Sequence, residues 1–354
     1  MAVFYMDGFD HYATNDIAKV WNYGGTGSNI LSTVPRRTGS KYLRIDNYTV
    51  SRPFPDYYTE VIIGFAIFQE DGLSDSTGFK VHIMDGSSTQ LILFANSTGR
   101  LKVHRSHLWN DVSYFLGETA AMKFTADSWY YVEIKAKIHD TLGTIDVQIN
   151  GVNELSLTGV DTKYTANTRT DGVKFEGASE HPACYDDIYF LNCSVSPNIT
   201  FLGDSRVDVM YPTSDHSVAW TRSAGTANWQ NVDDNDSGTG DIDDDTTYNY
   251  SSTATNEDVF DVEDPPVLVD EVVHALAVAW TAKKDDAGSR SVKCLIHSGA
   301  GTEYGTAVSL PGAGSDSYVQ YQTVWNTNPW STLAWNVDNV NEVNDINIGY
   351  NLDV

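Results

Sequence analysis

The sequence contains few of the residues on which several classes of protein depend. It has three cysteines, and 22 lysines and arginines against 48 aspartates and glutamates, which gives a formal charge of −26. Three cysteines cannot form a paired disulfide framework. So few basic side chains argue against a nucleic-acid binder and against a protein that lies on an anionic membrane, because both need Lys and Arg facing phosphates. No apolar run approaches the roughly 20 residues that span a bilayer.

We therefore expect no nucleic-acid partner and no membrane insertion. Residues 1–10 have neither a basic region nor an apolar stretch, so we also expect no secretory signal peptide. The cysteines, Cys184, Cys193 and Cys294, are expected to be small buried thiols made in a reducing cytoplasm.

The acidic charge is concentrated toward the C-terminus. Residues 215–354 carry 23 acidic and 5 basic side chains, a charge of −18 out of the total of −26. Such a change of charge density indicates a domain boundary, and 354 residues are enough for two domains at roughly 150 residues each. We predict a first domain over residues 1–197 and an acidic second domain over residues 198–354.

The hydrophobic pattern predicts β-strands almost throughout. Residues 129–138 place Tyr130, Val132 and Ile134 on one face, and residues 144–149 alternate in the same way. Asn150-Gly151 then predicts a tight hairpin turn, with residues 152–157 as the returning strand. Short strands separated by Gly, Asn and Asp are typical of a sandwich or jelly roll. The fold class is therefore all-β, with two β-sandwich domains.

The first domain resembles a known family of sandwiches. A Trp-Tyr pair opens residues 129–137, an Asn-Gly hairpin closes residues 144–151, and Asp-Asp-Ile-Tyr lies in residues 185–192. These segments are similar to the closing strands of concanavalin A-like, laminin-G-like sandwiches. Residues 6–10 are similar to the first strand as it occurs in bacteriophage structural proteins. The resemblance covers roughly residues 1–195 and implies a fold, with almost nothing about a ligand.

The second domain resembles the C-terminal module of phage tail-associated virion proteins whose front half is laminin-G-like. Residues 201–208 are expected to be an extended, exposed strand that connects the two domains. Residues 272–281 and 291–297 are expected to be strands of a second β-sandwich, and Asp338 is expected to cap a short helix that ends at Asn344. The segments that carry the resemblance are 220–221, 228–233, 244–248, 283–288, 325–329 and 344–349.

We find no constellation of residues that indicates catalysis. His104 and His107 are three residues apart, so on an extended chain their side chains face opposite ways. Asp186 and Asp187 are adjacent and would also point to opposite faces of a strand, which does not suit a glycosidase pair. The Glu-x-Asp-x-x-Glu strand of glucanases, the Gly-x-Ser-x-Gly elbow and the phosphate-binding glycine loop are all missing. We therefore expect no enzyme, and we assign no catalytic, cofactor-binding or metal-binding residue and no cofactor.

The aspartate-rich residues Asp233 to Asp244 match part of a calcium loop. Asp233, Asn235 and Ser237 fall at its first, third and fifth positions and Gly238 follows, but Asp244 stands where a bidentate Glu belongs. We favour a solvated acidic loop, and calcium binding is the open alternative. Most aromatic rings are expected to fill the two cores. Trp109, Tyr114 and Phe115 fall in a less regular stretch and are the expected exposed group, suited to stacking on a sugar or a partner protein.

These observations and the resemblance lead to a functional expectation. We expect a non-enzymatic structural protein of a bacteriophage virion, tail-associated (fibre, tip or adsorption apparatus), which is made in the host cytoplasm and assembles with other virion proteins as a homo-oligomer. The front sandwich would face outward for attachment, and the rear module would dock it to the particle. One alternative is a carbohydrate-binding receptor protein whose front sandwich binds a host cell-surface glycan. Another is a capsid-decoration or head-fibre protein, and the third class of function is a glycan-cleaving enzyme.

Overall fold

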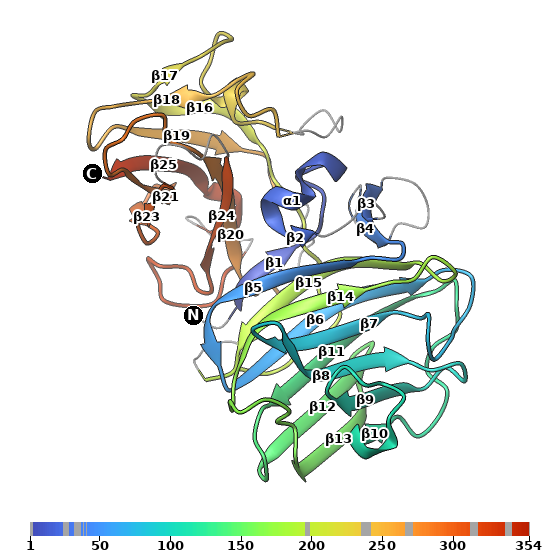
Figure 1. Ribbon diagram of the computed structural model, residues 1–354. Coiled ribbons are helices and arrows are strands. Elements are labelled where there is room, and N and C mark those ends of the chain that lie inside the picture. Colours follow the sequence, from blue (N-terminus) through green and yellow to red (C-terminus); the bar gives the residue numbers. More distant parts are fainter. Residues whose placement is uncertain are drawn as a thin grey trace. The chain divides into compact units, whose positions relative to one another are not determined.

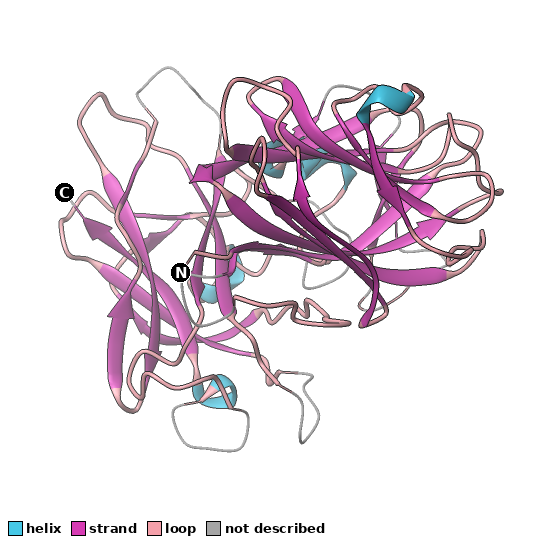
Figure 2. Ribbon diagram, turned by 90° about the horizontal axis from the view of Figure 1, so that it is seen from below, coloured by secondary structure: helices cyan, strands magenta, loops and turns pink. Residues whose placement is uncertain are grey.

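The computed structural model is nearly all β, as the sequence predicts, with only four short 3₁₀ segments and one four-residue α-helix among the residues that it describes (Figure 2). It describes residues 3–23, 28–31, 37, 39, 41–194, 199–234, 242–265, 272–311, 318–336 and 342–353. The chain divides into two compact units: the first contains Ala2–Asp10 and Val20–Val207, and the second contains Met1, His11–Lys19 and Asp208–Val354. The division expected between residues 197 and 198 lies outside the described residues and stays a prediction.

The first unit is a sandwich of two antiparallel sheets, which lie one behind the other in Figure 1. Sheet A has the order β13 (Val152–Val160), β12 (Gly143–Ile149), β11 (Trp129–Lys137), β6 (Glu60–Gln69), β15 (Ala183–Asn192), β4 (Tyr42–Ile45) and β3 (Ser28–Leu31), with β1 (Val3–Asp7) also paired to β15. Sheet B has the order β10 (Phe115–Glu118), β9 (Leu101–Arg105), β8 (Ser88–Ala95), β7 (Lys80–Asp85), β14 (Thr170–Glu176), β5 (Thr49–Tyr58) and β2 (Asn22–Tyr23). A 3₁₀ turn, η2 (Val112–Tyr114), precedes β10.

The predicted hairpin is confirmed. Ile149 pairs with Val152 across the turn, and both Asn150 and Gly151 have positive φ, at 49° and 75°. Positive φ at both central residues is typical of a type I′ turn, whose twist matches that of the flanking strands. Asn and Gly adopt these angles readily, which explains why they occupy the turn. The alternating residues of β11, among them Val132 and Ile134, are buried in the core.

The outward face of sheet A holds a buried carboxylate. Tyr189, Gly64 and Glu133 are direct cross-strand neighbours on β15, β6 and β11. A Cβ on Gly64 would lie 2.1 Å from the Tyr189 ring, so the ring crosses the strand only because Gly64 has no side chain. The Tyr189 hydroxyl donates to Oε1 of Glu133, which also accepts from the backbone amides of Leu202 and Gly203 at 2.8 and 3.0 Å.

Residues 199–207, the connecting segment, are therefore held on sheet A. They form no strand, and several of their side chains are half-buried, so the expectation of an extended, exposed strand over residues 201–208 is wrong. The pattern of apolar and polar residues there reflects docking onto a sheet face and not pairing at a sheet edge. Because these contacts belong to the first unit, the segment is part of that unit.

A bulge in β15 changes the geometry of Asp186 and Asp187. The register of β15 on β6 shifts between Asp186 and Tyr189, and Asp187 has a φ of 48°. The expectation that the two carboxylates point to opposite faces assumed a regular strand, and β15 is not regular at this point. Both side chains are buried, and burial together with the Asp187 charge raises the pKa of Asp186. Asp187 pairs with Arg37 and accepts from the Val207 amide at 2.8 Å, which fixes the end of the connecting segment.

The second unit contains a larger sheet and two strand pairs. The sheet has the order β16 (Pro212–Val218), β19 (Glu257–Val262), β25 (Asn347–Asp353), β21 (Ser291–Ser298) and β22 (Gly301–Tyr304), with β23 (Val308–Ser309) also on β21. The pairs are β20 (Leu276–Ala282) with β24 (Val319–Trp325), and β17 (Thr221–Arg222) with β18 (Asn249–Tyr250). The helical segments are η1 (Thr14–Asp16), η3 (Trp229–Asn231), η4 (Val343–Asp345) and α1 (Ile17–Val20), whose last residue lies in the first unit.

Core residues of the second unit come from the larger sheet and from the β20–β24 pair. Leu276 and Val278 of β20 pack with Cys294 and Ile296 of β21 and with Trp335. The expected helix begins at Asp338, which lies outside the described residues together with the rest of 337–341, and Val343–Asp345 form a 3₁₀ turn. All three cysteines are free, with Cys184 and Cys294 buried and Cys193 half-buried.

The aspartate-rich loop is only partly described, because residues 235–241 lie outside the described residues. At its end, the Ile242 amide donates to Asp16 at 2.9 Å, and Lys19 pairs with Asp16 and Asp244. In the described part of the chain, no group of three or more His, Cys, Asp or Glu side chains could hold a metal ion. The choice between a solvated loop and a calcium loop stays a prediction. No helix within the described ranges is long and apolar enough to cross a membrane.

Candidate functional site

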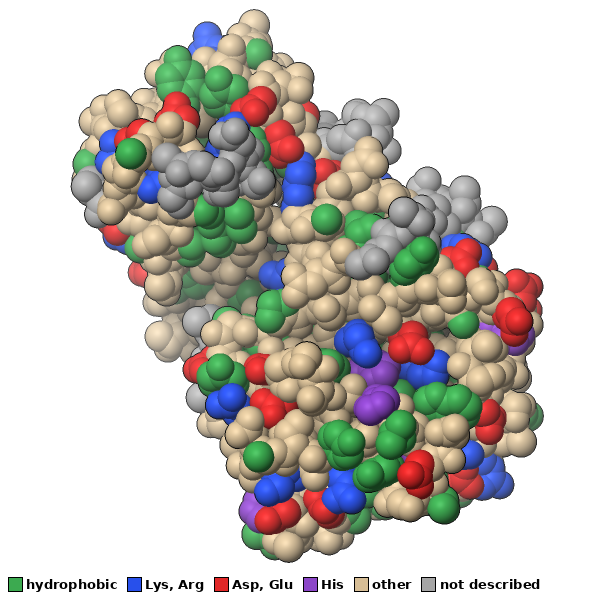
Figure 3. Space-filling view, in the orientation of Figure 1, with side chains coloured by type: hydrophobic (Ala, Val, Ile, Leu, Met, Phe, Trp, Pro, Cys, Tyr) green, Lys and Arg blue, Asp and Glu red, His purple; other side chains and the backbone are tan. Residues whose placement is uncertain are grey.

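The outward face of sheet B carries two adjacent rows of polar and aromatic side chains. Cross-strand pairing places Ser51, Lys174, His82, Ile92, His104 and Phe115 in one row, and Thr49, Glu176, Lys80, Phe94, Lys102 and Glu118 in the next. Because side chains alternate along a strand, both rows lie on the face opposite the core residues Val81 and Phe175. In Figure 3, the surface over β7 and β8 shows histidine between basic and acidic side chains, with hydrophobic side chains close by.

A groove opens on this face where β5 leaves the ladder. Pro53 pairs with Gly172 of β14, and Tyr58 pairs with Thr170, so residues 54–57 of β5 have only Asp171 opposite them. Proline has no N–H to donate to a ladder, and residues 52–55 read Arg-Pro-Phe-Pro, which explains why β5 bulges there. The bulge bounds a cavity of about 500 Å³, the β5–β14 groove, whose polar and aromatic lining includes Asn22, Ser51, Asp56, Tyr57, Asp171 and Lys174.

An aromatic ring stands at the rim of the groove. Tyr57 is 57% exposed, and the guanidinium carbon of Arg169 lies 3.7 Å from the centre of its ring. Arg169 is in turn held by Asp85, which accepts from its Nε at 3.3 Å and also accepts from Thr165 and Asn167. The ion pair of Arg169 with Asp85 thus fixes one side of the Tyr57 ring, and the ring remains mostly exposed to solvent.

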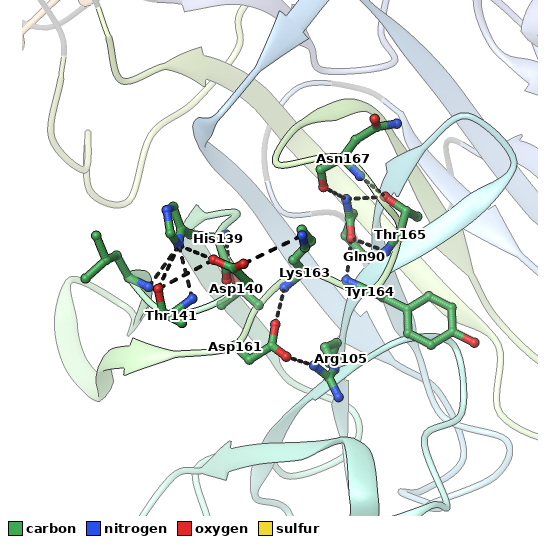
Figure 4. A network of polar contacts seen from close by, with 12 residues as sticks. Gln90, Arg105, His139, Asp140, Thr141, Asp161, Lys163, Tyr164, Thr165 and Asn167 are labelled. Carbon is green, nitrogen blue, oxygen red and sulfur yellow. Dashed lines mark hydrogen bonds and ion pairs between the residues drawn. The ribbon is translucent and has the colours of Figure 1, made fainter.

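The loop that supplies Arg169 is held by one buried amide. Gln90 of β8 donates from Nε2 to Thr165 Oγ1, Asn167 O and Arg169 O at 2.9–3.0 Å, and its Oε1 accepts from the amides of Tyr164 and Thr165 (Figure 4). Farther along the same loop, Asp161 pairs with Arg105 of β9. The loop over residues 161–169 therefore has a fixed backbone, which holds Arg169 against the Tyr57 ring that lines the groove.

Next to the groove, Glu176 joins two basic side chains. Its Oε1 accepts from Lys80 Nζ at 2.7 Å, and its Oε2 lies 3.2 Å from His82 Nε2. Burial raises the pKa of Glu176, but the hydrogen bond from His82 and the Lys80 charge outweigh it and lower the value to about 2. Burial lowers the pKa of His82 to about 4. At neutral pH Glu176 is an anion and can only accept, so His82 is neutral with its proton on Nε2, and Nδ1 accepts from the Thr89 hydroxyl at 3.1 Å.

The structure assigns different places to the side chains named from the sequence. Phe115 is 41% exposed, whereas Trp109 and Tyr114 are half-buried against Phe94 and Tyr164. Together they cover the outward face of β8 and β9, beside the groove and not in it. His104 is buried and His107 is exposed.

The groove residues were not found from the sequence. Tyr57 and Lys174 have no motif around them, and they come together only through the pairing of β5 with β14. One signal was present: two prolines within a strand-like run mark a place where the ladder must break. Bulges of this kind are frequent beside functional sites.

Comparison with known proteins finds partial similarities at low sequence identity. No protein-family model and no curated protein matches the chain. Solved structures that are similar to about half of it include a sialidase (14% identity, TM-score 0.39, 54% of this chain and 18% of that one), the alginate lyase Aly36B (14%, 0.37, 53% and 95%) and the carbohydrate-binding module CBM66 from Bacillus subtilis (10%, 0.34, 49% and 95%). The chain thus spans less than a fifth of the sialidase. At such identities the likeness concerns the fold.

These neighbours correct one expectation. The expectation that the protein is not an enzyme rests on the missing catalytic motifs, and it is wrong as drawn, because a sialidase and an alginate lyase are among the structures that match. The motifs tested belong to a few enzyme families, so their absence does not exclude chemistry on a sandwich of this kind.

Proposed function

We propose that the first unit binds a carbohydrate in the β5–β14 groove. The observation that carries the proposal is the exposed Tyr57 ring, fixed by Arg169 at the rim of a cavity of about 500 Å³ whose other lining groups are hydroxyl, amide, carboxylate and ammonium. Small-molecule sites are concave and combine apolar or aromatic surface with a few placed polar groups. A sugar ring presents an apolar face for the tyrosine and hydroxyl groups for Asn22, Ser51 and Asp171.

The walls of the groove support binding without rearrangement. The Asp171 carboxylate accepts from the Gly86 amide at 2.7 Å, and Asp85 and Gln90 hold the loop behind Tyr57. A preformed site loses less conformational entropy when the ligand binds, which favours affinity.

A glycan array carrying bacterial and mammalian glycans, followed by titration calorimetry with the strongest ligand, tests the proposal. Tyr57→Ala should weaken binding about tenfold or more, because stacking is lost, whereas Tyr57→Phe should bind like the wild type. Tyr250→Ala is the matched control, since Tyr250 is an exposed tyrosine of the second unit. Unchanged affinity in Tyr57→Ala, or no array signal at all, would contradict the proposal. Released reducing sugar, measured in the same samples, reports whether a bound glycan is also cleaved.

The virion role, with its homo-oligomer and its protein partners, stays a prediction that rests on the sequence resemblance. In that setting the groove would serve host attachment. Gel analysis of purified particles with copy-number estimation tests it: a few copies indicate a tail tip, hundreds indicate a shell position, and absence from the particle contradicts the role.

A further inference from the structure

Lys174 occupies an unusual position among the charged side chains that line the groove. The Asp56 carboxylate accepts from the Tyr57 amide, and the Asp171 carboxylate accepts from the Gly86 amide, both at 2.7 Å. The Arg52 guanidinium donates to the Val20 carbonyl and lies 3.9 Å from the centre of the Tyr5 ring. Within the described residues, the Lys174 ammonium makes no hydrogen bond and no ion pair.

Glu176, two residues along the same strand from Lys174, is already engaged. Glu176 binds Lys80 through one oxygen and His82 through the other. Lys174 is half-buried, and burial, together with the Lys80 charge, lowers its pKa in spite of Glu176. A cation without a bonded partner in a partly desolvated place is unfavourable, and an anion that enters the groove removes this cost.

We infer that the β5–β14 groove selects an acidic glycan, with Lys174 bonded to the carboxylate or sulfate group of the sugar beside Tyr57. The inference rests on the proposed function and adds the chemical class of the ligand. In a protein with a formal charge of −26, such a ligand is repelled elsewhere on the chain, so its binding requires a local cation. A charge-assisted hydrogen bond is about twice as strong as a neutral one, which makes Lys174 a specificity-determining residue.

The experiment compares acidic and neutral forms of the same sugar. The wild type is titrated with its strongest acidic ligand from the array and with the carboxyl-reduced or desulfated derivative of that ligand. We expect the acidic form to bind at least about tenfold more tightly than the neutral derivative. This difference in affinity, the margin, should shrink as the salt concentration rises from 50 to 500 mM. Lys174→Met should abolish the margin, because the acidic form then loses a bond that the neutral derivative does not make. Lys137→Met, which removes the same charge from β11 of sheet A, should keep the margin.

The outcomes separate the inference from the proposed function. If the array ligands of the wild type are all neutral, or if Lys174→Met keeps the margin, the inference is wrong and carbohydrate binding stands. If Tyr57→Ala has no effect or no glycan binds, the proposed function falls and the inference falls with it. Circular dichroism and thermal melting of each variant exclude misfolding as the cause of a lost margin.

Discussion

Gly64 shows how one missing side chain fixes a polar network. Its backbone lies beneath the Tyr189 ring, which reaches over β6 to donate to Glu133 of β11. No unusual backbone angle is involved, since Gly64 is not among the residues with positive φ, so the requirement for glycine is steric.

Gly64→Ala should therefore destabilise the first unit by about 3 kcal/mol, because the new methyl group displaces the Tyr189 ring and breaks its hydrogen bond. Chemical denaturation measures the loss. In a Tyr189→Ala background the same substitution should cost much less, because the ring is gone. Equal costs in both backgrounds would show that the ring is not the cause.

Asp85 is a positioning residue for the groove. It accepts from Arg169, Thr165 and Asn167, and these bonds lower its pKa although burial opposes them. Asp85→Ala should release Arg169 and weaken glycan binding several-fold, although Asp85 is not among the residues that line the groove. Asp85→Asn keeps an acceptor and should bind better than Asp85→Ala. If both variants bind like the wild type, Tyr57 does not depend on this support.

At the scale of elements, Glu133 holds the start of the connecting segment on sheet A. Glu133 is fully buried, its Oε1 accepts from Tyr189, Leu202 and Gly203, and its Oε2 has no partner in the described structure. Burial raises the pKa of this carboxyl.

Glu133→Ala should leave three donors without an acceptor and destabilise the first unit by roughly 3 kcal/mol. The amides of Leu202 and Gly203 should then exchange with deuterium faster than the strand amides of β11. Lys135→Ala, two residues along the same strand with a surface ion pair to Glu60, should cost less than about 1 kcal/mol. Unchanged exchange at Leu202 and Gly203 would show that other contacts hold the segment.

Elements with strict alternation could be predicted from the sequence, and those that depend on non-local contacts could not. The hairpin of β12 and β13 follows from period-two burial and Asn-Gly, both of which are local. The connecting segment has strand-like composition, but its partners are side chains on the face of sheet A, namely Glu133 of β11, 69 residues before Leu202, and Asp187 of β15, 20 residues before Val207. The groove likewise depends on the register between β5 and β14, which lie more than 100 residues apart. The two prolines of β5 are the only local signal that indicates it.

At the scale of the molecule, the buried His82 and the half-buried Asp234 make the units respond oppositely to pH. In the first unit, burial lowers the pKa of His82 from 6.5 to about 4. Below pH 6.5 the unfolded chain binds a proton there that the folded chain does not, so acidification destabilises this unit down to pH 4. In the second unit, burial, followed by the charges of Asp243 and Asp233, raises the pKa of Asp234 from 3.8 to about 7. Between pH 4 and 7 the folded chain holds a proton that the unfolded chain has lost, so acidification stabilises this unit.

Each group contributes a slope of about 1.4 kcal/mol per pH unit within its window, with opposite signs. We therefore predict opposite effects as the pH rises from 4 to 6.5. The contribution of His82 should raise the melting temperature of the first unit, and the contribution of Asp234 should lower the melting temperature of the second unit. Scanning calorimetry of the full chain at several pH values should show His82→Gln flattening the pH dependence of one transition, and Asp234→Asn raising the other most at pH 7 and above. If both variants shift the same transition, the two units do not unfold separately. If Asp234→Asn has no effect at pH 8, the Asp234 carboxyl is as well solvated in the folded chain as in the unfolded one.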